Sequence, residues 1–94
     1  MQIKLKFLGA LRHASGKDRV TLDCENGASI LDIICAASRR KASLRQNLLD
    51  EQLETPKPHA LILVNGREIS ILEGLATKVK DGDEVVFVPV VHGG

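Results

Sequence analysis

The sequence predicts an α+β fold in which one main helix packs on one face of a mixed β-sheet. Three observations support this: alternating apolar and polar residues near the start, an apolar stripe at helical spacing after them, and an apolar run close to the end. The chain has 94 residues, of which 44% are hydrophobic and 27% are charged. That length and balance are typical of one globular domain with a single modest core.

Two strands are expected before the helix. Residues 2–8 and residues 19–23 alternate between apolar and polar side chains, which indicates strands buried on one face. The inward residues of the first strand are Ile3, Leu5 and Phe7. We interpret residues 9–17 as a loop, and the closeness of the two strands in the sequence therefore predicts a hairpin.

The main helix is expected to begin near Ser29. The segment from Ser29 to Asp32 matches a capping box, in which the serine caps the helix and the carboxylate reaches back. An apolar stripe follows at helical spacing and comprises Ile30, Ile33, Ile34 and Ala37. The basic triplet 39–41 falls at the expected end of the helix, where positive charge complements the helix dipole. This local role explains the triplet more simply than a binding patch does.

The middle of the chain carries a weaker pattern. Residues 43–54 predict one or two helical turns, which Pro56 and Pro58 would end. The apolar run 59–64 then predicts a buried strand. The Asn65-Gly66 pair directly after this run indicates a tight turn.

The end of the chain completes the sheet. Residues 67–69 would form a short return strand, residues 70–80 look irregular, and residues 81–83 read as a turn. The last strand, 84–89, is apolar on both faces, which is usual for a central strand. The first and last strands would then lie side by side and parallel in the centre of the sheet, which is the β-grasp layout.

Composition argues against several classes of function. Phe7 and Phe87 are the only aromatic residues and the net charge is +1, so we expect no direct binding to nucleic acid. We recognise no signal peptide and no membrane span, and we expect a cytoplasmic protein. Cys24 and Cys35 are too few for a disulfide framework and are read as reduced thiols, with Cys35 in the core.

The sequence shows no pattern typical of a resident cofactor. His13, His59 and His92 have no metal-ligand spacing with either cysteine, so we expect no metal site. No phosphate loop or dinucleotide motif is present, and we therefore expect that the chain alone binds no ATP.

Several segments together resemble the MoaD/ThiS family of ubiquitin-like sulfur carriers. They are Phe7-Leu8-Gly9-Ala10-Leu11-Arg12 with Gly16, Val64-Asn65-Gly66, Val79-Lys80-Asp81-Gly82-Asp83-Glu84-Val85, Pro89, and the terminal Gly93-Gly94. The family includes the small subunit of molybdopterin synthase, the ubiquitin-related modifier and the small archaeal modifier proteins. The stretch 90–92 departs from the MoaD pattern, whereas the His-Gly-Gly end is similar to the ubiquitin-related modifier.

The resemblance implies a β-grasp domain over residues 1–89 and a flexible tail over residues 90–94. It also implies that a separate activating enzyme uses ATP to adenylate the carboxylate of Gly94. This chain would be a co-substrate or carrier subunit, not an enzyme. Sulfur would then replace AMP, and the thiocarboxylate would donate it to a molybdopterin synthase large subunit or to a tRNA thiolase.

Two alternatives remain open for the tail. The activated Gly94 could be attacked by target-protein lysines, which would make the chain a protein modifier. A further alternative is a non-covalent β-grasp interaction module whose tail is inert. We favour sulfur transfer over conjugation as the ancestral chemistry. The last glycines suit either reaction, because residues without side chains can thread a narrow channel.

Partner binding is expected on the sheet face away from the helix. Alternation along the strands puts Leu8 and Val88 on that open face, with Val86 nearby, and exposed apolar groups suggest an interface. The resemblance adds Arg12, which matches an arginine that approaches the partner. The alternative is that residues 70–80 cover this face.

The tail itself supplies the remaining expected contacts with the partner, from Val91, His92 and Gly93. The five residues beyond Pro89 reach at most about 17 Å when extended. This length lets the carboxylate enter a deep pocket while the folded body docks outside it.

Overall fold

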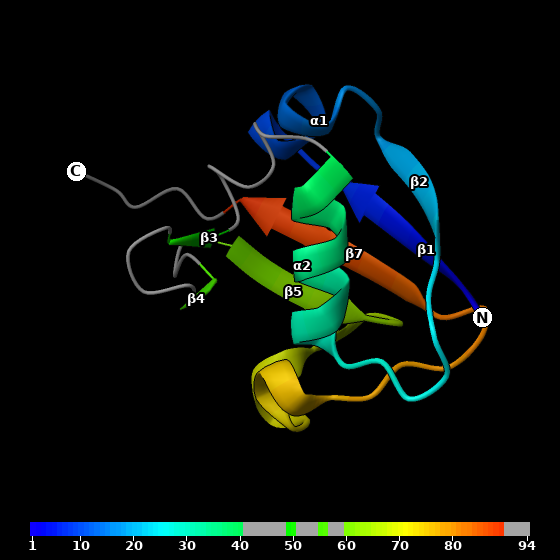
Figure 1. The fold of residues 1–94 in the computed structure, drawn as a ribbon. Helices are drawn as coiled ribbons and strands as arrows, with labels where there is room; N and C mark the ends of the chain where they lie inside the picture. The colour runs from blue at the N-terminus through cyan, green and yellow to red at the C-terminus, as the bar shows by residue number, and fades with distance from the viewer. Residues whose placement is uncertain (41–48, 51–54, 57–59, 90–94) are drawn as a thin grey trace.

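A computed structural model of the chain describes residues 1–40, 49–50, 55–56 and 60–89. In this part of the chain, the main sheet has the strand order β2-β1-β7-β5-β6 (Figure 1). Its strands are β1 (Gln2–Phe7), β2 (Arg19–Asp23), β5 (Ala60–Val64), β6 (Arg67–Glu68) and β7 (Glu84–Pro89). The helix α2 (Ile30–Arg40) crosses one face of the sheet. The architecture confirms the expected α+β fold.

The centre of the sheet is a parallel pair formed by the first and last strands. In the β1–β7 ladder Leu5 lies opposite Val85, and Phe7 lies opposite Phe87. The two phenylalanine rings stack with their centroids 5.2 Å apart and an angle of 11° between their planes. All four side chains are buried. This arrangement is the β-grasp layout expected from the sequence.

The helix α2 buries its apolar stripe against the sheet. Its buried apolar residues are Ile30, Ile33, Ile34 and Ala37. At its start, the Ser29 N–H donates to the Asp32 carboxylate at 3.0 Å, and the Asp32 N–H donates to Ser29 Oγ at 3.3 Å. The Ser29 N–H and the Ser29 hydroxyl both donate to the Asp32 carboxylate, and this holds the pKa of Asp32 below its usual value. The capping box is therefore confirmed, and the helix ends within the basic triplet as expected.

The expected place of Cys35 in the core is wrong. Its side chain is only partly buried and does not join the residues packed around the core. Cys24, at the end of β2, is also partly buried, but it does pack against the core. The cause is geometric, because Cys35 sits beside the stripe of α2 and not within it.

The expected loop between β1 and β2 contains a helix, α1 (Ala10–Ser15), so that part of the expectation is wrong. Gly9 precedes this helix at φ 55°, and Gly16 ends it in the left-handed conformation. Leu11 anchors the helix because its side chain is 4% exposed. A helix this short presents too few inward residues for a helical period to be recognised.

The expected helical turns within residues 43–54 are contradicted where the structure describes them. Leu49–Asp50 is the strand β3, which pairs antiparallel with β4 (Thr55–Pro56). The rest of residues 43–54 lies outside the described residues. The prediction rested on the spacing of Leu44, Leu48 and Leu49, and three residues are too few to separate a helix from an extended segment.

The two turns predicted at one end of the sheet are both present and bonded to each other. Asn65 and Gly66 have φ angles of 50° and 84°, which close the hairpin between β5 and β6. The Asn65 side chain donates to the Asp83 carboxylate at 3.0 Å and accepts from the Glu84 N–H at 3.0 Å. Asp83 also accepts from the Lys80 N–H at 2.8 Å. Asp83 is therefore a turn residue, as the sequence suggested.

Residues 70–80 lie on the helix side of the molecule and do not form a cover for the open face. They include most of η1 (Ile69–Ile71) and all of η2 (Gly74–Ala76), which lie beside the start of α2 (Figure 1). The Thr77 carbonyl accepts from the Ile30 N–H at 2.9 Å. Among the described helices, none has the length and apolar character needed to cross a membrane.

Candidate functional site

The candidate site begins where β7 ends. Because β1 and β7 run parallel, their carboxyl ends lie at the same edge of the sheet (Figure 1). Pro89 is the last described residue, and it is therefore the root of the expected tail. The expected tail residues Val91, His92, Gly93 and Gly94 lie outside the described residues.

The root of the tail is packed against Gly9. The Leu8 N–H donates to the Phe87 carbonyl at 3.1 Å, which continues the parallel ladder to the start of α1. A Cβ atom on Gly9 would lie 2.8 Å from Cγ of Pro89, well inside van der Waals contact. Gly9 also has φ 55° and ψ −134°, a conformation that residues with side chains rarely adopt. Glycine is thus required here both by the backbone and by the neighbouring ring.

Strand β5 holds the other side of the root. Ala60 lies opposite Pro89 in the antiparallel β5–β7 ladder, and Leu61 lies opposite Val88. Pro89 is therefore placed between a tight turn on one side and a paired strand on the other. Pro89 is thus held at a fixed position at the edge of the sheet.

An apolar patch on the open face adjoins this root. We call it the open-face patch, and its members are Leu8, Leu61, Leu63, Val86 and Val88. All five side chains are partly exposed. Their neighbours Phe7 and Phe87 are at most 1% exposed, on the helix side of the sheet. The expected placement of Leu8 and Val88 on the open face, with Val86 nearby, is confirmed.

Arg12 lies on α1, close to the same edge of the sheet. Its side chain is exposed, whereas its neighbour Leu11 is buried between α1 and the core. In Figure 1, α1 lies beside the ends of β1 and β7. The structure therefore places Leu8, Arg12 and Val88 at the same edge of the sheet as Pro89.

Sequence reasoning missed Gly9, Leu61 and Leu63. The two leucines lie in an apolar run whose two faces cannot be told apart by periodicity. Leu61 and Leu63 pair with Val88 and Val86 in the β5–β7 ladder, and this pairing places them on the open face. For Gly9 the available signal was its place directly after a strand, but contact with Pro89 is a property of the folded chain.

The described residues include no group of three or more histidine, cysteine or acidic side chains arranged to hold a metal. Cys24 and Cys35 are both free. Burial raises the pKa of the Cys24 thiol, so its nucleophilic thiolate form is disfavoured at neutral pH. The described residues therefore form an apolar surface beside Pro89, and the surroundings of Cys24 do not favour a nucleophilic thiolate.

Comparison with known proteins agrees with this geometry. Residues 5–94 match the model of the ThiS family. Small archaeal modifier protein 3 of Haloferax volcanii is 31% identical over 94 residues, with all of both chains covered. Ubiquitin-related modifier 1 homolog 1 of Arabidopsis thaliana is 32% identical over 103 residues, again with all of both chains covered. The solution structure of small archaeal modifier protein 1 from Methanosarcina acetivorans has a TM-score of 0.88 and 30% identity, and covers 99% of this chain and 96% of that one.

The fold and the site define a small ubiquitin-like protein of the β-grasp class. The chain belongs to the ThiS family of ubiquitin-like sulfur carriers and modifiers. The resemblance found in the sequence is thereby confirmed.

The contact between Gly9 and Pro89 can be tested with a matched pair of variants. Gly9→Ala and Gly74→Ala both place a side chain at a positive φ, of 55° and 59°, but only Gly9 has a neighbour within 4 Å of the added Cβ. We expect Gly9→Ala to lower the free energy of unfolding by about 1 kcal/mol more than Gly74→Ala, since it adds a collision to the backbone strain. Urea denaturation measures both values.

A third variant tests whether collision with the Pro89 ring causes the loss of stability in Gly9→Ala. Removing the ring with Pro89→Ala in the Gly9→Ala background should recover part of the lost stability. Equal losses in the two glycine variants, or no recovery in the double variant, would show that the root is not held by this contact.

Proposed function

We propose that this protein is a ubiquitin-like sulfur carrier whose Gly94 carboxylate is adenylated by a separate activating enzyme and converted to a thiocarboxylate. One observation supports this most directly. In this chain of the ThiS family, Pro89 is held beside an exposed apolar patch, and the sequence continues from Pro89 to Gly93 and Gly94. A reactive end and a docking surface are what a carrier must offer its partner.

The proposed chemistry follows from the weakness of a carboxylate as an electrophile. Attack of the Gly94 carboxylate on the α-phosphate of ATP forms an acyl adenylate and releases pyrophosphate. A sulfide-level nucleophile from a sulfur donor then attacks the acyl carbon, and AMP leaves with the electron pair of the broken bond. The tail now ends in a thiocarboxylate. The activating enzyme holds ATP, and this chain contributes the carboxylate as a co-substrate.

Docking would use the open-face patch. Partly exposed Leu8 and Val88 lie next to Pro89, so a partner that covers them also receives the tail. The five residues of the tail span at most about 17 Å, which sets the depth of the partner's channel. Glycines at positions 93 and 94 pass through a narrow channel because they carry no side chain. Val91 and His92 would line its mouth, and Arg12 would approach the partner beside it.

The sulfur would pass from this carrier to an acceptor enzyme, either of the molybdopterin synthase large-subunit type or a tRNA thiolase. The chain itself would contact neither nucleic acid nor membrane. The proposal places the protein in the cytoplasm, where the thiols of Cys24 and Cys35 stay reduced.

A second candidate function is conjugation of Gly94 to lysines of target proteins. It is favoured by the names of two relatives that align over their full length, both of which are called modifiers. The same acyl adenylate serves both outcomes, since a lysine amine can displace AMP as sulfide does. The remaining alternative is an interaction module with an inert tail.

Removal of the last two glycines tests the proposed activation. With the activating enzyme of the native host, the full chain should support exchange of pyrophosphate into ATP, whereas the chain without Gly93 and Gly94 should support none. The reason is that only a seated C-terminal carboxylate can attack ATP. Equal exchange by both proteins, or by neither, would contradict the proposal and leave the interaction module.

The open-face patch is tested by placing a charge on it. Val88→Asp should raise the KM of the activating enzyme for this protein about tenfold or more, because an apolar side chain buried at an interface is worth about 1.5–3 kcal/mol. Thr21→Asp is the matched control, since Thr21 is exposed on the same face of the sheet but is level with Glu84 at the start of β7, whereas Val88 lies near the end of that strand. Similar KM values for the two variants would argue for docking elsewhere.

Intact mass measurement on protein from the native host separates the two candidate functions. A carrier should show one oxygen replaced by sulfur at its C-terminus, and alkylation of the thiocarboxylate should shift that species. A modifier should instead appear in ladders of higher mass on immunoblots. Ladders without any sulfur-containing species would favour conjugation over sulfur transfer.

A further inference from the structure

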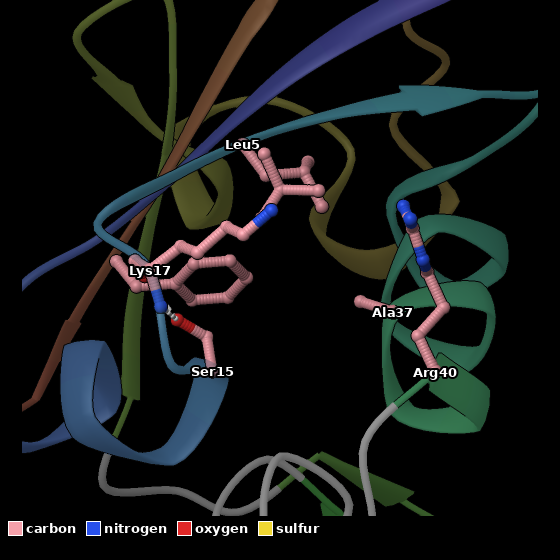
Figure 2. Close-up of a pocket in the computed structure, with 7 residues that line it drawn as sticks. Leu5, Ser15, Lys17, Ala37 and Arg40 are labelled. Atoms are coloured by element: carbon pink, nitrogen blue, oxygen red, sulfur yellow. Dashed lines mark hydrogen bonds between the residues drawn. The ribbon is translucent and has the colours of Figure 1, made fainter.

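A recess lies on the helix side of the sheet, away from the open-face patch. It has a volume of about 200 Å³ and opens between β2 and α2 (Figure 2). Its apolar lining comes from Leu5, Phe7, Val20 and Ala37. A dry cavity of about 150 Å³ already takes up a molecule the size of benzene, so this recess has room for a branched aliphatic side chain.

The strand beside the recess has a free edge. β2 is the outermost strand on its side of the sheet. The Phe7 N–H donates to the Asp18 carbonyl at 2.8 Å. This bond identifies which residues of β2 direct their backbone N–H and C=O groups toward β1 and which direct them away. By alternation, the backbone groups of Val20 point toward β1, while those of Arg19 and Thr21 point outward. Within the described residues, no backbone group bonds to this outer edge.

Natural proteins usually protect such an edge with proline, a bulge or a covering segment, because it can pair with another extended chain. β2 contains no proline, and its pairing with β1 runs without interruption from residue 19 to residue 23. In the part of the chain that the structure describes, this edge is therefore open to strand addition.

Two cations border the recess. Lys17 comes from the turn after α1, and Arg40 comes from the last turn of α2; in Figure 2 the two side chains flank the opening. The Lys17 backbone is held in place because its N–H donates to Ser15 Oγ at 3.0 Å and Gly16 before it is left-handed. Neither cation forms an ion pair with another described residue. The recess thus combines an apolar floor with a positive rim.

We propose that this recess, together with the outer edge of β2, binds an extended acidic segment of a partner protein. The segment would add to the sheet as a further strand through the outward backbone groups of Arg19 and Thr21. One of its branched apolar side chains would enter the recess, and adjacent acidic side chains would face Lys17 and Arg40. Backbone pairing supplies affinity in this mode, and the recess and the rim supply specificity.

This site is independent of the proposed tail chemistry. It lies on the helix side, whereas the open-face patch and the root at Pro89 serve the activating enzyme. A partner bound at β2 could therefore remain in place while the tail is loaded. The site offers a non-covalent means of bringing a target or an acceptor to the loaded carrier.

The test is an NMR titration of the full 94-residue chain with capped synthetic peptides. One peptide carries four valine or isoleucine residues followed by aspartates, and a second carries the aspartates first. We expect saturable amide shifts in residues 19–23 and at Ala37 and Arg40 with one of the two peptides. Which peptide binds would report whether the added strand is antiparallel or parallel.

Charge reversal gives the decisive comparison. Lys17→Glu with Arg40→Glu should weaken binding by about tenfold or more, since two favourable pairs become repulsive. The control is Arg67→Glu with Lys80→Glu, which changes the net charge equally at exposed positions away from the recess and should leave binding unchanged. Thr21→Pro removes the outward-facing backbone N–H of residue 21 and leaves the hydrogen bonds between β2 and β1 in place. This variant should also abolish binding.

Three outcomes of the peptide titrations would overturn the proposal. They are a lack of saturable shifts with either peptide at millimolar concentration, equal effects of the two charge reversals, and shifts confined to the open-face patch. Shifts in β2 that grow with protein concentration alone would identify the occupant as a second copy of this chain and would equally refute an acidic partner. Deleting Gly93 and Gly94 should not alter peptide binding, so this result stays separate from that of the activation test.

Discussion

The parallel pairing of β1 with β7 is the constraint on which the rest of the structure depends. Leu5 and Val85 are far apart in the sequence but lie opposite each other in the ladder, and Phe7 stacks on Phe87 at its end. A parallel pair cannot be closed by a tight turn. The chain between the two strands must therefore make a long crossing, and α2 makes this crossing over one face and buries its stripe there. The helix therefore covers one face of the sheet and leaves the other face open, and this difference follows from the pairing of β1 with β7.

The same pairing builds the candidate site from the two ends of the sequence. Because the strands are parallel, the start of α1 and the end of β7 lie at one edge, and Gly9 packs against Pro89 there. The open-face patch continues from this edge across β7 and β5. The recess between β2 and α2 lies on the other face, bordered by Lys17 and Arg40. A protein this small can in this way present two surfaces that do not compete for the same partner.

Local signals in the sequence predicted most of the fold. The alternation in β1 and β2, the capping box at Ser29 and the Asn65-Gly66 turn each act over a few residues, so their chemistry is visible before folding. The helix α1 was missed because a helix of six residues, with Leu11 as its buried apolar anchor, is too short to show a helical period. The strand β3 was missed because a short ladder depends on its partner and leaves little trace in its own composition. The roles of Leu61 and Leu63 were hidden by an apolar run that shows no period.

The sequence by itself determined the class of fold, the parallel centre of the sheet and the pattern that places this chain in the ThiS family. Alternation also determined that Leu8 and Val88 face away from the helix. Only the tertiary structure decided that Gly9 must lack a side chain, that β5 completes the open-face patch, and that the outer edge of β2 lies beside an apolar recess. Periodicity reports which way a side chain points along its own element, whereas contacts between elements arise only when strands distant in sequence are brought into register.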